Sequence, residues 1–66
     1  MYAIRNRRTR LFVYGTDYRY HPPHQRTSNG KVLVYETERE AQFDFRHRGC
    51  GKDYEIVPVR MEVLED

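Results

Sequence analysis

Four short stretches rich in β-branched and aromatic residues predict four β-strands. These stretches are Tyr2–Asn6, Arg10–Tyr14, Lys31–Tyr35 and Tyr54–Val63. Glycine, proline or polar residues bound them, as is typical of strands in small domains. In the last stretch Val59, Met61 and Val63 alternate with polar residues and share one face. Pro58 lacks the N–H that a central strand requires, so we expect this strand at a sheet edge or with a bulge.

A single helix is predicted after the third strand. Thr37 and Glu40 have the spacing of a capping box, in which the Thr hydroxyl caps the backbone and the Glu side chain reaches back. We expect the helix to cover Glu38–Arg48 and to stop at Gly49, a residue suited to a left-handed C-cap.

The predicted helix has apolar residues on two sides. Ala41 and Phe45 share one stripe and should face the sheet, whereas Phe43 and His47 lie on a stripe about 160° away from Phe45. Two explanations remain open for the second stripe. The loop before the third strand, folded around a metal ion, covers it, or Phe43 is exposed as an anchor for a partner.

The segment from Thr16 to Gly30 shows no periodicity and is predicted to be a long loop. The expected order is therefore β-β-loop-β-α-β. This order predicts one small α+β domain over residues 1–66, with a single antiparallel or mixed sheet crossed by one helix.

A chain of this length buries little apolar surface and often needs a disulfide, a metal or a partner for stability. Its only cysteine excludes an intramolecular disulfide. His21, His24, His47 and Cys50 form the pattern H-x2-H-x22-H-x2-C, which uses every histidine and the cysteine. Two closely spaced pairs of such ligands are typical of a closed structural Zn²⁺ site. Taken singly, the same residues are ordinary solvated histidines and a small buried thiol.

Charge is unevenly distributed along the chain. Residues 1–31 carry seven basic side chains and one acid, whereas residues 32–66 carry five basic and nine acidic side chains. This asymmetry favours contact between the first half and a polyanion or an acidic protein surface, although a dipolar domain with a solubilising turn is also possible. The candidate partner-binding residues are Arg5, Arg7, Arg8, Arg10, Tyr18, Arg19, Tyr20 and Arg26.

The residues indicate a binding protein rather than an enzyme. Four protein ligands would close a zinc site to substrate, and no histidine would remain as a base for a hydroxyl nucleophile. No stretch is long enough to span a membrane and the first residues do not resemble a signal peptide, so we expect a cytoplasmic protein. A nucleic-acid-binding zinc module, an inhibitor of a nucleoprotein complex and a structural protein-interaction domain all remain open.

Three runs carry a resemblance to small phage-encoded proteins. They are Met1–Asn6, the Phe12–Tyr18 run, and the step from Tyr35 through Thr37 to Ala41. The chain resembles the anti-CRISPR proteins of phages and prophages of Gram-positive bacteria. The resemblance lies in these runs, in the size of the chain and in its set of histidines and one cysteine. The resemblance implies a zinc-containing α/β inhibitor that acts on guide-RNA-loaded Cas9 in the host bacterial cytoplasm and blocks target DNA binding or cleavage. The chain departs from the acidic DNA mimics of that group because its net charge is +2.

Overall fold

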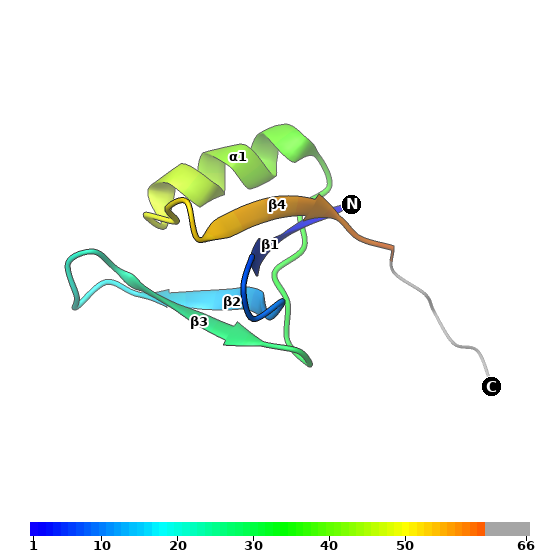
Figure 1. Cartoon of the computed structure of the whole chain (residues 1–66). Helices are drawn as coiled ribbons and strands as arrows, with labels where there is room; N and C mark the ends of the chain where they lie inside the picture. The colour runs from blue at the N-terminus through cyan, green and yellow to red at the C-terminus, as the bar shows by residue number, and fades with distance from the viewer. Residues whose placement is uncertain (61–66) are drawn as a thin grey trace.

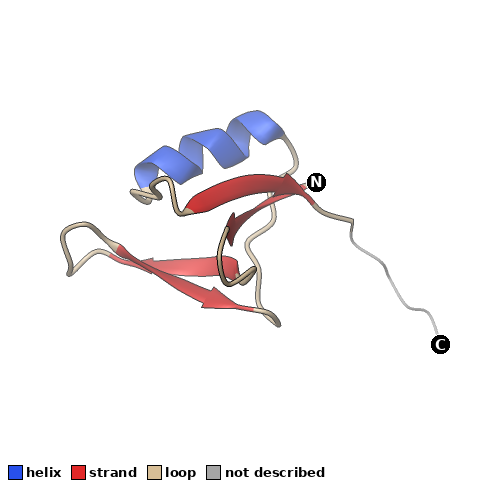
Figure 2. Ribbon diagram, viewed as in Figure 1, coloured by secondary structure: helices blue, strands red, loops and turns tan. Residues whose placement is uncertain are grey.

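Four strands and one helix form the fold in the computed structural model, which describes residues 1–60 (Figures 1 and 2). In chain order they are β1 (Tyr2–Asn6), β2 (Phe12–Asp17), β3 (His24–Ser28), α1 (Glu38–His47) and β4 (Tyr54–Pro58). The α+β class with one sheet and one helix is confirmed. All neighbouring strands are antiparallel, in the order β3-β2-β1-β4.

The predicted edge position of the last strand is confirmed, but its predicted length is not, because β4 ends at Pro58 and the described residues 59 and 60 are outside it. β4 lies at an edge of the sheet, next to β1, and Pro58 is opposite Tyr2 at its end. The missing N–H of Pro58 therefore leaves no gap in the middle of the sheet. Met61 and Val63, which were predicted to share one face of this strand with Val59, lie outside the described residues.

The prediction of the third strand is wrong. β3 covers His24–Ser28, within the segment predicted to be a loop, and β2 continues past Gly15 to Asp17. The sequence of β3 is almost wholly polar, so it shows no hydrophobic alternation. Its backbone pairs with β2 along its length, with a register shift between Val13 and Gly15. Backbone pairing in an edge strand does not require an apolar face.

The apolar run Lys31–Tyr35, here called the bridging segment, links two strands instead of forming one. β1 and β2 pair directly only at Arg5 and Phe12. Away from that point Tyr35 exchanges two backbone hydrogen bonds of 2.8 Å with Tyr2 in β1, and the Leu33 N–H donates to the Val13 carbonyl in β2 at 3.1 Å. The bridging segment thus occupies the gap that opens between β1 and β2 as the sheet curls.

Local signals place both ends of α1 close to the prediction. The Thr37 side chain accepts a hydrogen bond from the Glu40 N–H at 3.2 Å, as in the first half of a capping box. Within residues 1–60 the reciprocal bond to the Glu40 carboxylate is not formed. At the other end Gly49 has a φ of 69°, and the N–H groups of Gly49 and Cys50 donate to the last carbonyls of the helix. This arrangement is a Schellman motif.

The core is small. Ala3, Ile4, Val13 and Ala41 are the only buried hydrophobic residues within the described part of the chain. α1 packs on β1 and β4, and Ala41 faces the sheet as expected. Ala3 and Ile4 are adjacent in β1 and point to opposite faces, yet both are buried. β1 is therefore the strand that is covered on both sides.

A cross-strand ion pair joins β1 and β4. Arg5 and Glu55 are directly opposite each other, and the Arg5 guanidinium donates to the Glu55 carboxylate at 2.6 Å and 3.0 Å. About a quarter of each side chain is exposed. The hydrogen bond from Arg5 holds the pKa of Glu55 below its ordinary value.

This ion pair predicts a loss of stability in acid. A carboxyl group whose pKa is lowered by folding contributes stability that is present above the ordinary glutamate pKa and is lost as the pH falls through the lowered value. In urea unfolding between about pH 6 and pH 2, we expect the wild-type chain to lose this contribution and Glu55→Gln to lack it throughout. An equal decline in both chains would contradict the assignment.

Candidate functional site

The end of α1 lies against the start of β3, and this contact brings the two predicted ligand pairs close together. A Cβ added to Gly49 would lie 3.1 Å from Cδ of Pro23, so the proline ring packs on the glycine backbone. The Gln25 amide donates to the Arg48 carbonyl at 2.6 Å. Pro23 stands between the two histidines of the first pair, and Gly49 stands between His47 and Cys50.

The four predicted ligand side chains do not converge. The ring of His24 stacks on Tyr20 at 4.0 Å between centroids, and the ring of His47 stacks on Phe43 at 5.1 Å. His21 is exposed and Cys50 is half-buried. Within residues 1–60 no group of three or more His, Cys, Asp or Glu side chains is placed to hold a metal ion. The donor chemistry fits zinc but these side-chain positions do not, so the zinc site stays a prediction.

The protonation state of the Cys50 thiol also bears on zinc binding. Burial raises the pKa of the Cys50 thiol to about 11. The thiol is therefore protonated at neutral pH, whereas zinc binds the thiolate. Zinc binding at Cys50 would have to release this proton.

A polar network that the sequence did not reveal joins α1 to the rest of the fold. Arg48, the C-cap residue, donates through Nε to Asp44 at 2.5 Å and through Nη1 to the Thr16 hydroxyl at 2.9 Å. The Thr16 hydroxyl donates in turn to the Gln25 side chain at 2.7 Å. Asp44 also accepts a hydrogen bond from the Tyr35 hydroxyl. This network, here called the Arg48 network, connects the helix with β2, β3 and the bridging segment.

The titration of the network follows from its geometry. Burial together with the hydrogen bond to Asp44 raises the pKa of Tyr35 to about 12. Burial alone would raise the pKa of Asp44, but the hydrogen bonds from Arg48 and Tyr35 lower it. At neutral pH the network therefore consists of a neutral phenol, a carboxylate and a guanidinium.

Arg7, Arg8 and Arg10 lie together at the turn between β1 and β2, here called the arginine tip. The backbone of the turn is held by the Asn6 side chain, which accepts hydrogen bonds from the N–H groups of Arg8 and Thr9, both at 2.9 Å. Arg10 has a φ of 66°, in the left-handed region. The three arginine side chains are exposed.

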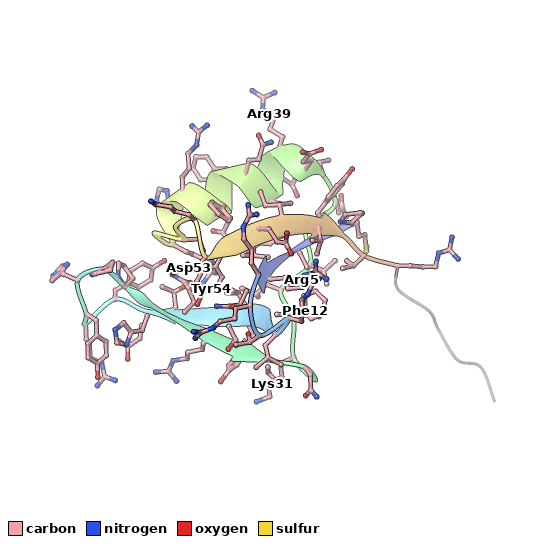
Figure 3. The ribbon with its side chains drawn as sticks, in the orientation of Figure 1. Arg5, Phe12, Lys31, Arg39, Asp53 and Tyr54 are labelled. Atoms are coloured by element: carbon pink, nitrogen blue, oxygen red, sulfur yellow. The ribbon has the colours of Figure 1, made fainter. Side chains whose placement is uncertain are left out.

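A hollow of about 230 Å³ opens beside the arginine tip. It is lined by Asn6, Arg7, Arg8, Asp53 and Tyr54. The Arg7 N–H donates to the Asp53 carbonyl at 2.8 Å, and its guanidinium donates to the Tyr54 carbonyl at 3.2 Å. Figure 3 places Asp53 and Tyr54 next to each other at the start of β4. The tip is therefore held at the start of β4 by one backbone hydrogen bond and by one hydrogen bond from the Arg7 side chain.

The remaining predicted partner residues lie elsewhere or are already paired. Arg5 is bound to Glu55. Arg19 and Arg26 both pair with Asp17, at 2.7 Å and 3.6 Å. The hydrogen bond from Arg19 strongly lowers the pKa of Asp17. The group of Arg19, Arg26 and Asp17 therefore has a net charge of only +1.

Tyr18 and Tyr20 are exposed at the turn between β2 and β3, here called the tyrosine tip. The two tips lie at opposite ends of β2 (Figure 1). A strand of six residues separates them by about 17 Å. The residues predicted to form one binding surface therefore form two.

The outer face of α1 is a third exposed surface. Phe43 is 67% exposed, which is the highest value among the exposed large hydrophobic residues of the described chain. Of the two explanations left open for Phe43, exposure is the one that holds among residues 1–60, none of which buries its side chain. Arg39 projects from the helix away from the sheet (Figure 3).

Within residues 1–60 no helix is long and apolar enough to cross a membrane.

The zinc prediction has a direct test. We expect one zinc ion per chain by mass spectrometry after purification without chelator, and loss of that ion in Cys50→Ser. Because metal binding and folding are coupled, EDTA should lower the wild-type unfolding free energy, by up to the order of 10 kcal/mol seen in zinc-finger peptides. A chain that carries no zinc and unfolds identically with and without EDTA would refute the site.

Comparison with known proteins does not assign the chain to a family. No protein-family model matches the chain. No curated protein and no solved structure matches it either. The function is therefore argued from the residues and their arrangement.

Proposed function

We propose that this protein is a non-enzymatic binding protein whose arginine tip contacts the phosphates of a nucleic acid. The observation that supports the proposal is the pairing state of the arginines. Arg7 and Arg8 are exposed, line one hollow and form no ion pair within residues 1–60. Neither charge is therefore neutralised by an ion pair among these residues, and the Arg7 guanidinium donates only to the Tyr54 carbonyl.

The surrounding charges keep the tip positive. Glu55 is engaged by Arg5 at 2.6 Å and by Arg10 only at 3.7 Å. Asp53 lines the same hollow and is the one acidic residue there. The hollow is therefore lined by two arginines and one acidic residue, and Arg10 is exposed in the same turn. Guanidinium groups present a planar pair of donors that matches phosphate oxygens.

The rigid turn supports the same proposal. Hydrogen bonds to the Asn6 side chain and the backbone contact with Asp53 fix the main chain of the tip. Arginine side chains on a fixed turn lose less conformational freedom on binding than the same side chains on a mobile loop. The binding is expected to be insensitive to base sequence, because phosphate contacts carry no sequence information.

The resemblance to anti-CRISPR proteins narrows the proposal to a ribonucleoprotein target, guide-RNA-loaded Cas9. The combination of a phosphate-binding tip and an exposed apolar helix face on one chain supports this narrower form, because a nucleoprotein offers both kinds of surface. A zinc ion held by His21, His24, His47 and Cys50 would have a structural role only in this proposal.

The tip is tested by salt dependence. We expect binding of single- and double-stranded oligonucleotides, measured by fluorescence anisotropy, to weaken steeply as salt is raised. Arg7→Gln/Arg8→Gln should reduce the slope of log K against log salt by about 1.4 to 1.8, the value for two lost phosphate contacts. The matched control is Arg39→Gln/Arg46→Gln, which removes the same charge from the helix and should leave the slope nearly unchanged.

Equal slopes for the two double variants would show that binding follows net charge and would contradict the proposal. The tip variant also tests the narrower form. Retention of purified Cas9–guide RNA by the wild-type chain, lost with the tip variant, would support it. Oligonucleotide binding without Cas9 retention would leave a general nucleic-acid-binding module.

A further inference from the structure

The outer face of α1 combines an exposed aromatic ring with unpaired positive charge. Arg39, Gln42, Phe43 and Arg46 fall within an arc of about 100° around the helix axis. Ala41, Asp44, Phe45 and Arg48 fall on the opposite side. Glu38 and Glu40 project between these two faces, so the outer stripe itself contains no acid. Within residues 1–60 Arg39 and Arg46 form no ion pair.

Two hollows flank the Phe43 ring. The larger, of about 450 Å³, is mostly apolar and is lined by Tyr35, Arg39, Glu40, Phe43 and Asp44. The smaller, of about 240 Å³, is lined by Arg39, Gln42, Phe43 and Arg46. Arg39 and Phe43 belong to both. A ligand side chain in the larger hollow would therefore contact two aromatic rings, with the Arg39 guanidinium at its rim.

The chemistry of these hollows favours a protein segment over a nucleic acid. Glu40 and Asp44 line the larger hollow beside its two aromatic rings, so an uncharged apolar group suits this hollow better than a phosphate does. One face of the Phe43 ring is already occupied by His47, whose ring stacks on it with an interplanar angle of 21°. An apolar side chain fits between Tyr35 and Phe43 without displacing that stack. Exposed aromatic and arginine side chains are the residues that are enriched in protein interfaces.

We propose that the Arg39/Phe43/Arg46 face of α1 binds an acidic protein segment that carries one apolar anchor residue. The anchor enters the hollow between Tyr35 and Phe43, and flanking Asp or Glu residues pair with Arg39 and Arg46. Charge complementarity selects this occupant, because the outer stripe has two permanent positive charges and no negative one. The surface is separate from the arginine tip and does not depend on the proposed nucleic-acid binding.

Selection from a random dodecapeptide phage library on the immobilised full-length chain tests this proposal. A parallel selection on Phe43→Ser removes peptides that bind elsewhere. We expect the enriched peptides to place Asp or Glu beside a Leu, Ile or Phe. A synthetic peptide of that sequence should bind at least about tenfold more weakly to Phe43→Ser and to Arg39→Gln/Arg46→Gln, the loss typical of an anchor residue.

Binding of that peptide to Arg7→Gln/Arg8→Gln should be unchanged, which separates this surface from the arginine tip. Enrichment of basic or uncharged peptides, or equal affinity for Phe43→Ser, would overturn the proposal. Oligonucleotide-induced NMR shifts centred on Phe43 would assign the face to nucleic acid instead. A concentration-dependent dimer in ultracentrifugation that Phe43→Ser abolishes would assign it to a second copy of the chain.

Discussion

The fold depends on the contact that Arg48 makes at the end of the helix. Only four hydrophobic residues within the described chain are buried, so apolar packing alone gives α1 little support. The guanidinium of Arg48 reaches both Asp44 and Thr16, while its carbonyl accepts the Gln25 amide. Each of these groups is half-buried, and each would be costly to leave without a partner. The Arg48 network therefore joins the helix to β3, the two elements that carry or adjoin the predicted zinc ligands His24, His47 and Cys50.

The fixed position of α1 also determines which surfaces are free. With Asp44 and Arg48 turned inward, the opposite stripe of the helix presents Phe43 between two arginines. The arginine tip is fixed separately, by the Asn6 side chain and by the Asp53 carbonyl just before β4. Two exposed surfaces of different chemistry therefore carry the two proposals: a cationic turn, proposed to contact phosphate, and an aromatic and cationic helix face, proposed to bind an acidic protein segment. A nucleoprotein target would engage both.

The parts of the fold set by local chemistry were predictable from the sequence. β1 has its predicted bounds, and the helix follows from the Thr37 cap and the left-handed Gly49. β3 was missed because its pairing with β2 depends on backbone register and not on apolar alternation. The bridging segment was misassigned because its apolar residues serve two strands at once. The Arg48 network could not be inferred, since its hydrogen bonds span from 4 to 32 residues and follow no motif spacing. The position of the arginine tip could be predicted, because it follows from the turn between two predicted strands.

The central role of Arg48 is tested most directly by urea unfolding of Arg48→Gln beside Arg46→Gln. Both substitutions remove one positive charge from the end of the same helix, but only Arg48 has partners in β2 and within α1. We predict that Arg48→Gln lowers the unfolding free energy by about 2 kcal/mol, the scale for lost hydrogen bonds to a charged group. Arg46→Gln should change it by less than about 0.5 kcal/mol. Equal effects of the two substitutions would contradict the account.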